Sequence, residues 1–260
     1  MASYPDDLIL AGKLADAADS ITTARFRARD LEVSSKPDRT PVTDADTAVE
    51  DAVREVLAAD RPDDNVAGEE RGGSQWQSGR AWVLDPIDGT KNFLRGGPVW
   101  ATLIALVEDG QPVVGMVSAP LLGRRWWAAA GAGAWMSDPA GERPISVSSV
   151  RELSDAYLST TDLGSWTEYH SREAYLGLVE ACWETRAFGD FWHHCLVAEG
   201  AIDLAAEPIV NPWDVAPMQI LLTEAGGRFS DLTGAVRFDG GSALSSNGHL
   251  HDEALKHLRR

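Results

Sequence analysis

The stretch Asp85-Pro86-Ile87-Asp88-Gly89-Thr90 directly follows the apolar run Ala81-Trp82-Val83-Leu84, which predicts a short buried strand. Two aspartates three residues apart at the end of such a strand cannot both enter a core, because unpaired buried carboxylates need cations or solvent. Oxygen ligands of this kind suit hard divalent ions such as Mg²⁺. Gly89 and Thr90 leave backbone N–H groups free where a helix could begin, which favours a bound phosphate. The stretch therefore indicates phosphoryl chemistry.

Further acidic positions strengthen this interpretation. Glu69 lies in the upstream segment Gly68–Glu70, Asp46 lies near the start of a predicted helix, and Asp214 lies in Pro212–Ala216. Carboxylates brought together would repel one another or raise their pKa values unless divalent cations entered the cluster. Bound magnesium activates water and stabilises the leaving oxygen in phosphoryl transfer. Since no Cys, His or Ser nucleophile motif competes in the sequence, the acids favour direct attack by water.

Three signatures occur in a fixed order: Gly68–Glu70, Trp82–Thr90, and Trp213–Ala216 running to Gly226-Gly227. In these segments the chain resembles the inositol monophosphatase superfamily of lithium-sensitive, magnesium-dependent phosphatases of sugars and metabolites. The resemblance implies an α+β fold, built as a five-layer αβαβα sandwich. It also implies a homodimer.

The resemblance implies a metal-binding role for five residues. Asp85 would bridge two metals, and Asp88 and Asp214 would bind the second of them. The carbonyl of Ile87 and the carboxylate of Glu69 would bind the first, and Glu69 would also position water on a third. We expect two or three Mg²⁺ ions, with Mn²⁺ as a substitute. The alternatives are ordinary turn aspartates and, for Asp214, an acid stabilised by a helix N-terminus.

The same resemblance gives Asp46 and Thr90 a catalytic role, positioning the water that attacks, with Gly89 and Thr90 contacting the phosphate. Asp46 has a strong alternative, because Thr43 and Asp46 have the spacing of a capping box that needs no catalysis. Glu70 is the more dispensable neighbour of Glu69 in the family pattern.

The leaving group is chosen by other residues. The chain has Gly189-Asp190 followed by aromatics, and Thr102–Leu106, as in the histidinol-phosphatase branch, whereas typical inositol monophosphatases have Gly-Ser-Ala at the first position. Histidinol phosphate carries an ammonium and an imidazole, which acids recognise by charge-assisted hydrogen bonds. The candidate substrate-binding residues are Asp190, Glu207, Asn211 and Arg186. Asp190 could instead be a helix N-cap, and Arg186 could pair with a nearby acid.

The preferred function is a magnesium-dependent phosphomonoesterase acting on L-histidinol phosphate in histidine biosynthesis. The alternatives are inositol-1-phosphate, fructose-1,6-bisphosphate or a nucleotide 3′-phosphate as substrate, and a non-catalytic, metal-binding regulator. His193 and His194 are adjacent, and at least one of them is expected to be a core or helix-surface residue. Trp76, in the loop 71–79, could fold over a ligand or a dimer partner.

Composition limits the partners. The net charge of −17 over 260 residues argues against binding nucleic acid or an anionic membrane through bulk electrostatics. The N-terminal residues lack the pattern of a signal peptide, and no apolar run is long enough to span a membrane. Cys182 and Cys195 are expected to be free thiols in a reducing cytoplasm.

Periodicity and turn residues predict the elements. Residues 34–41 are expected to form a loop, and Glu108–Gln111 a hairpin turn within an antiparallel meander. The chain is expected to divide into halves at 1–145, which holds the metal-binding loop, and 146–260, which holds the substrate pocket. The other expected elements are helices over 8–22, 43–57, 169–182, 190–199 and 213–225, and strands over 102–107, 113–118, 125–130, 155–160, 184–188 and 202–206.

Overall fold

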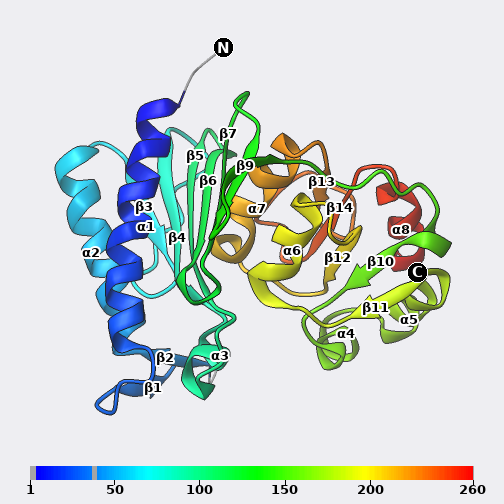
Figure 1. Ribbon diagram of the computed structural model, residues 1–260, viewed down its shortest axis with the longest axis horizontal. Coiled ribbons are helices and arrows are strands. Elements are labelled where there is room, and N and C mark those ends of the chain that lie inside the picture. Colours follow the sequence, from blue (N-terminus) through cyan, green and yellow to red (C-terminus); the bar gives the residue numbers. More distant parts are fainter. Residues whose placement is uncertain (1–3, 37–39, 260) are drawn as a thin grey trace.

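The aspartate stretch lies at the end of β4 (Arg80–Asp88), the second strand of a seven-stranded sheet. The computed structural model describes residues 4–36 and 40–259. In Figure 1 two sheets alternate with three layers of helices, from α1 and α2 at one side to α4, α5 and α8 at the other. This arrangement confirms the expected α+β class and the αβαβα order of layers.

The first half of the chain builds the outer helical layer and the large sheet. The sheet has the order β3-β4-β5-β6-β7-β8-β9; β3 is parallel to β4, and every later pair is antiparallel. The elements are α1 (Pro5–Arg25), β1 (Val33–Ser35), β2 (Pro41–Thr43), α2 (Asp44–Asp60), β3 (Asn65–Gly68), α3 (Thr90–Arg95), β5 (Ala101–Glu108), β6 (Gln111–Ala119), β7 (Arg124–Ala129), β8 (Ala134–Asp138) and β9 (Gly141–Ile145).

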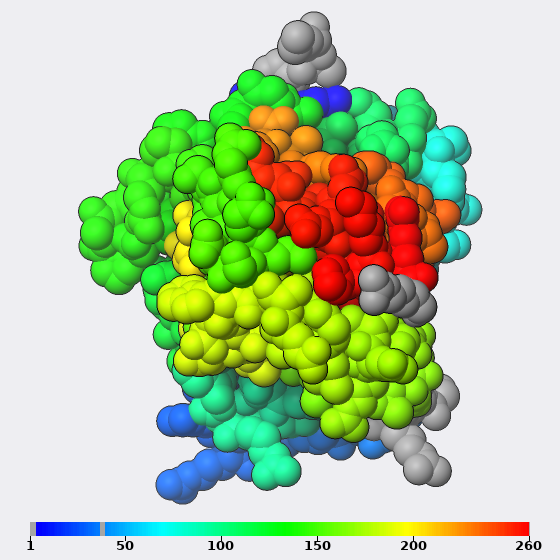
Figure 2. Space-filling view, turned by 90° about the vertical axis from the view of Figure 1, so that its right-hand side faces the viewer, coloured from blue at the N-terminus to red at the C-terminus, as the bar shows by residue number. Residues whose placement is uncertain are grey.

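The second half builds the other three layers. Its sheet has the order β11-β10-β12-β14-β13. Figure 2 shows the outermost layer face on, with α8 in red beside α4 and α5 in yellow-green. The elements are β10 (Tyr157–Ser159), α4 (Leu163–Tyr169), α5 (Arg172–Ala181), β11 (Glu184–Arg186), α6 (Asp190–Ala198), β12 (Leu204–Glu207), α7 (Pro212–Glu224), β13 (Arg228–Ser230), β14 (Ala243–Ser246) and α8 (His251–Leu258).

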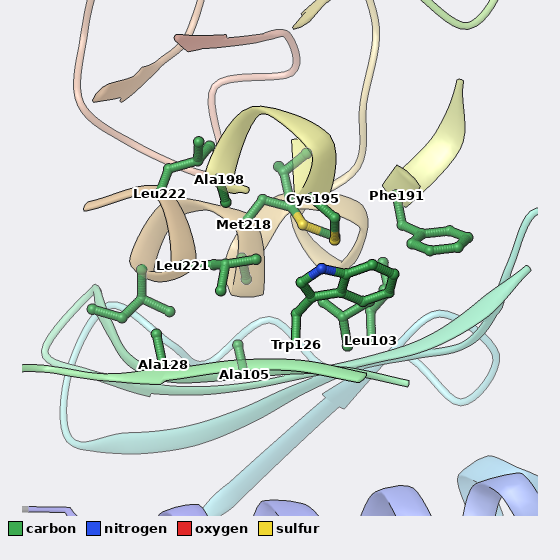
Figure 3. Packing of buried hydrophobic residues seen from close by; sticks show 14 of the residues in the cluster. Leu103, Ala105, Trp126, Ala128, Phe191, Cys195, Ala198, Met218, Leu221 and Leu222 are labelled. Carbon is green, nitrogen blue, oxygen red and sulfur yellow. The ribbon is translucent and has the colours of Figure 1, made fainter. Parts of the chain in front are cut away.

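Strand β4 is apolar on both faces because helices cover both faces of its sheet. Trp82 and Leu84 pack with the apolar sides of α1 and α2, whereas Ala81 and Val83 join the cluster beneath α6 and α7. Figure 3 shows this second cluster, in which Trp126 of the large sheet lies below Cys195 of α6 and Met218 of α7. The buried, continuous apolar run predicted at residues 81–84 therefore has a direct structural cause.

Helix α7 is apolar all round because it lies between the two sheets. It approaches β6 most closely at Gly115. A Cβ at Gly115 would lie 2.6 Å from Ile220 Cγ2 and 2.7 Å from the Pro217 carbonyl oxygen. Glycine at this position therefore sets the depth at which α7, and the Asp214 it carries, sits on the sheet.

Several local predictions need correction. Residues 33–35 and 41–43 pair as the antiparallel strands β1 and β2 instead of forming only a loop, and the predicted loop residues 37–39 lie outside the described residues. Strand β4 does not end at Leu84, because its pairing continues to Asp88 with a register shift after Asp85. The helix expected over 169–182 is present as α5, and a further helix that was not predicted, α4, precedes it.

Trp76 packs within the chain itself. Its side chain is buried, its ring centroid is 5.9 Å from that of Phe238, and its indole N–H donates to Asp239 at 3.4 Å. By contrast, the expected capping box at Thr43 and Asp46 is present at the start of α2. Among residues 4–36 and 40–259, no helix is long and apolar enough to cross a membrane.

The last strand of the large sheet, β9, ends at Ile145, and the first strand of the second sheet, β10, begins at Tyr157. Helices α6 and α7 nevertheless join one cluster with the large sheet and also contact the second sheet. Independent folding of 1–145 and 146–260 stays a prediction.

We expect Gly115→Ala to destabilise the protein by about 1–3 kcal/mol, because the added methyl overlaps the backbone of α7 and forces overpacking. Thermal unfolding followed by circular dichroism measures this. Gly12→Ala is the matched control. Gly12 lies within α1 with nothing within 4 Å of an added Cβ, so this change should stabilise by up to about 1 kcal/mol. Equal stability of Gly115→Ala and the parent chain would contradict the packing described.

Candidate metal and phosphate site

Three aspartates from two elements meet where the large sheet faces α7. Asp85 and Asp88 come from the end of β4, and Asp214 comes from the first turn of α7. One carboxylate oxygen from each lies within 4.8 Å of the other two. Asp85 is buried and the other two are half-buried, and all three members of this aspartate trio line one cleft.

Backbone N–H groups orient each member of the aspartate trio. Asp85 Oδ1 accepts from the Ile87 N–H at 2.9 Å, and Asp88 Oδ2 accepts from the Phe191 N–H at 2.7 Å. Asp214 Oδ2 accepts from the Asn211 N–H at 2.7 Å. Each carboxylate is thus held by one oxygen, which fixes the direction of the other.

The electrostatics of the aspartate trio favour a cation. Burial, reinforced by Glu69, raises the pKa of Asp85 well above its usual value, and burial together with Asp190 does the same for Asp88. Burial raises the pKa of Asp214 to about 7, despite the hydrogen bond from the Asn211 backbone. A hard divalent ion would remove this repulsion, and three carboxylate oxygens are the donors that such an ion prefers. The residues present therefore fit a divalent metal.

Glu69 and Glu70 are bridged by a lysine. Lys36 Nζ lies 2.6 Å from Glu69 Oε1 and 2.7 Å from Glu70 Oε1. Burial lowers the pKa of Lys36, but the two carboxylates outweigh it and raise the pKa above its usual value. Glu69 lines the same cleft as Asp85. A metal that binds Glu69 must therefore compete with the ammonium group of Lys36.

Glu50 supports this glutamate turn and was not identified from the sequence. Its fully buried carboxylate accepts from the backbone N–H groups of Glu70 at 2.8 Å and Arg71 at 3.1 Å, and from Arg54 Nε at 2.9 Å. A Cβ at Gly68 would lie 2.2 Å from Glu50 Oε1. Residue 68 must therefore be glycine, because a side chain there would occupy the space of the Glu50 carboxylate. The sequence did contain a signal for this role: Glu50 lies on the apolar face of the second predicted helix, four residues before Arg54.

Asp46 is buried and serves the capping box. Its Oδ2 accepts from the Thr43 N–H at 2.7 Å and the Thr43 hydroxyl at 2.6 Å, while its buried Oδ1 has no hydrogen-bond partner. Burial raises the pKa of Asp46 to about 6. The Thr90 hydroxyl donates to the Ile87 carbonyl at 2.9 Å. The capping alternative is therefore confirmed, and the role of Asp46 and Thr90 toward water stays a prediction.

The cleft has two adjoining compartments. The metal compartment, of about 520 Å³, contains Glu69, Asp85, Ile87 and the Gly89-Thr90 turn. The acidic compartment, of about 550 Å³, contains Glu207 and His194 and shares wall residues with the first. The shared residues are Thr40, Asp88, Lys91, Thr161, Asp162, Asp190 and Asp214.

Thr161 connects two of the predicted substrate-binding residues and was missed in the sequence. Its hydroxyl donates to Glu207 Oε1 at 2.6 Å and accepts from the Asp190 N–H at 2.8 Å. Asp190 has a left-handed backbone with φ of 48°, and Asn92 Nδ2 donates to its carboxylate at 3.0 Å. The N-cap of α6 is Gly189, so the N-cap alternative for Asp190 is wrong.

The other two candidates have different positions. Asn211 lines the metal compartment and its side chain lies 3.3 Å from Asp214 Oδ2. Arg186 is exposed on β11, where its Nη1 pairs with Glu184 Oε1 at 2.5 Å, and it lines neither compartment. Asp190, Glu207 and Asn211 therefore lie at the cleft. Arg186 does not, and it pairs with a nearby acid, which was the alternative to substrate binding.

Comparison with known proteins gives a consistent result. The model of the "Inositol monophosphatase family" matches residues 7–260. A histidinol-phosphatase of Mycobacterium tuberculosis is 58% identical over 97% of this chain and 98% of its own, and one of Streptomyces coelicolor is 51% identical over 100% and 99%. Among solved structures, an inositol monophosphatase from Zymomonas mobilis has a TM-score of 0.86 and 32% identity, covering 100% of both chains.

We expect the raised carboxyl pKa values to make the metal-free protein lose stability as the pH rises from about 5 to 8, although the buried histidines, with lowered pKa values, oppose this trend below about pH 6.5. The folded-state pKa values of Asp46 (about 6), Asp214 (about 7) and Glu207 (about 8) lie above their unfolded values. The folded chain therefore holds protons that the unfolded chain has released, and this contribution is lost as each group ionises. Thermal unfolding in a chelator, repeated with saturating Mg²⁺, measures the effect.

Added Mg²⁺ should flatten this pH dependence, because it binds the folded carboxylates and stabilises them by mass action. Asp214→Asn should reduce the slope in the chelator, since one of the titrating groups is removed. A metal-free protein that becomes more stable between about pH 6.5 and 8 would show that the cluster is not self-repulsive.

Proposed function

The chain belongs to the inositol monophosphatase family, and we propose that it is a magnesium-dependent histidinol-phosphatase, which releases phosphate from L-histidinol phosphate. The observation that carries this proposal is the junction of the aspartate trio with the acidic compartment. The aspartate trio would hold the metal that phosphate chemistry requires, and the acidic compartment suits a cationic leaving group. The names and high identities of the two relatives support the same substrate.

The residues that would hold the metal are those of the metal compartment. Asp85, Asp88 and Asp214 offer one oxygen each within 4.8 Å, and Glu69 and the Ile87 carbonyl line the same wall. Two or three Mg²⁺ ions bound there would activate water and stabilise the leaving oxygen, and Mn²⁺ is a plausible substitute. We assign Gly89 and Thr90, at the start of α3, to the phosphate.

The protein's own groups orient the reacting parts. Asp46 carries an unpartnered buried oxygen and a raised pKa, which suits a group that holds or accepts a proton from water. Asp190 and Glu207 face the acidic compartment, where they would bind the ammonium or imidazole of histidinol. Asn211 would border the leaving group from the side of Asp214.

The family resemblance also supports a cytoplasmic homodimer that acts in histidine biosynthesis. Sedimentation velocity measures the assembly; a monomer at micromolar concentration would contradict the dimer.

We expect purified protein with Mg²⁺ to release phosphate from L-histidinol phosphate faster than from inositol-1-phosphate, fructose-1,6-bisphosphate or a nucleotide 3′-phosphate. Asp85→Asn should abolish turnover on all of them, because it removes a buried ligand at the centre of the aspartate trio. Its metal-free form should unfold at a higher temperature, since repulsion is relieved. Full activity of Asp85→Asn would refute the assignment of the metal site, and a preference for another ester would replace the substrate.

We expect Glu207→Gln and Asp190→Asn to weaken the use of histidinol phosphate by about 10- to 150-fold in kcat/KM. Each change removes a charge-assisted contact of roughly 1.5–3 kcal/mol. Both amides retain an oxygen for the existing donors, Thr161 and Asn92, so the fold should persist. Inositol-1-phosphate kinetics provide the control. Unchanged selectivity in both variants would refute recognition by these acids while leaving the phosphatase assignment in place.

A further inference from the structure

Two adjacent histidines of α6 lie buried behind the acidic compartment, and nothing in the proposed chemistry uses them. His193 Nε2 lies 3.2 Å from Glu207 Oε1 and 3.1 Å from His194 Nε2. His194 Nδ1 lies 2.7 Å from Ser245 Oγ on β14. Their exposed fractions are 0% and 2%, so both rings have lost nearly all contact with water. Each contact between these buried rings needs one donor and one acceptor, so the nitrogen that carries the hydrogen on one ring decides which nitrogen carries it on the next.

The surroundings of His193 place its proton on Nε2. Ser159 Oγ accepts from the Phe188 N–H at 3.2 Å and lies 3.3 Å from His193 Nδ1, and we assign the serine hydroxyl as the donor to Nδ1. Nδ1 is then the acceptor, and Nε2 carries the hydrogen, 3.2 Å from Glu207 Oε1.

The arrangement of His194 follows from that of His193. Its Nε2 faces the His193 Nε2–H and accepts from it, so the hydrogen of His194 lies on Nδ1, where it donates to Ser245 Oγ. Each ring then carries one hydrogen and no charge. Burial acts in the same direction, since it lowers the pKa of His194 to about 3 and that of His193 well below its usual value.

The contacts with Thr161 and His193 hold one oxygen of Glu207 in place. Oε1 accepts from the Thr161 N–H at 2.8 Å and the Thr161 hydroxyl at 2.6 Å, and the His193 Nε2–H lies beside it. Among the contacts of the described residues, Oε2 is the acceptor left for a ligand in the acidic compartment. Because both imidazoles are neutral, they orient the Glu207 carboxyl group without placing a positive charge beside it, and a bound cationic leaving group would favour its ionised form. An imidazolium at His193 would instead form an internal ion pair and weaken the attraction for a cation.

We propose that His193 and His194 are positioning residues for substrate selection: a neutral relay from Ser159 to Ser245 that aims the Glu207 carboxylate at leaving groups bearing N–H donors. This inference rests on the proposed histidinol-phosphatase activity. It predicts that the histidines act on selectivity through Glu207 and have little effect on the aspartate trio. A purely structural role would instead change stability without changing the preference among substrates.

Two substitutions of His193 separate these roles. Glutamine places an N–H near the position of Nε2 and can keep the contact with Glu207, whereas asparagine mimics Nδ1 and keeps only the contact with Ser159. We expect His193→Asn to lower kcat/KM for histidinol phosphate by about tenfold, mainly through KM, with a loss of about threefold or less for inositol-1-phosphate. His193→Gln should restore most of the selectivity.

His251→Gln is the matched control. His251 is also fully buried and also contacts two serine hydroxyls, Ser230 and Ser246, but it belongs to α8 and lines neither compartment. It should change the melting temperature without changing the ratio of the two kcat/KM values. The relay is overturned if His193→Asn keeps the parent ratio, or if His251→Gln shifts the ratio equally.

Nitrogen NMR of the unaltered protein tests the relay without any variant. At neutral pH, His193 should carry its hydrogen on Nε2 alone and His194 on Nδ1 alone. An imidazolium at either position, or the opposite tautomers, would overturn the proposal even if His193→Asn failed to fold. Unaltered protein that prefers inositol-1-phosphate would instead refute the proposed function, and the tautomers would still be read independently of it.

Discussion

The site depends on carboxylates that lie so close together that they would repel one another strongly if all were ionised. Asp85, Asp88 and Asp214 converge within 4.8 Å, and the ammonium group of Lys36 pairs with Glu69 and Glu70 instead. The fold supplies part of the missing positive charge through backbone N–H groups, notably those of Phe191 in the first turn of α6 and Asn211 at the start of α7. Helix N-termini stabilise anions only partly, so the remaining repulsion is relieved by bound protons or by bound cations.

The layered fold is what brings these groups together. β4 ends at the interface between the large sheet and the middle helices, and α7 reaches it because Gly115 lets the helix lie directly on β6. A buried strand and a buried helix are rigid supports, which hold ligands in place better than mobile loops do. The glutamate turn is held in the same manner by the buried carboxylate of Glu50.

Features set by neighbours in the sequence could be predicted. A few consecutive residues are enough to recognise the capping box of Thr43 and Asp46, the buried run before Asp85 and the apolar helix that carries Asp214. Contacts between distant segments could not. Glu50 lies 20 residues from Glu70, and Thr161 lies 46 residues from Glu207, so no local pattern reports either pair. The position of Trp76 could not be predicted for the same reason, since the ring it contacts, Phe238, belongs to the other end of the chain.

The first turn of α6 joins the chemistry to the choice of substrate. The N–H of Asp190 bonds the Thr161 hydroxyl, which holds Glu207, while the N–H of the next residue, Phe191, holds Asp88. Consecutive peptide groups thus anchor one acid of the metal compartment and one of the acidic compartment. Because the backbone at Asp190 is left-handed, this turn has little freedom to move one acid without the other. Under the proposed function, a leaving group bound at Glu207 would lie at a fixed distance from the aspartate trio, which is the geometric condition for attack on its phosphate.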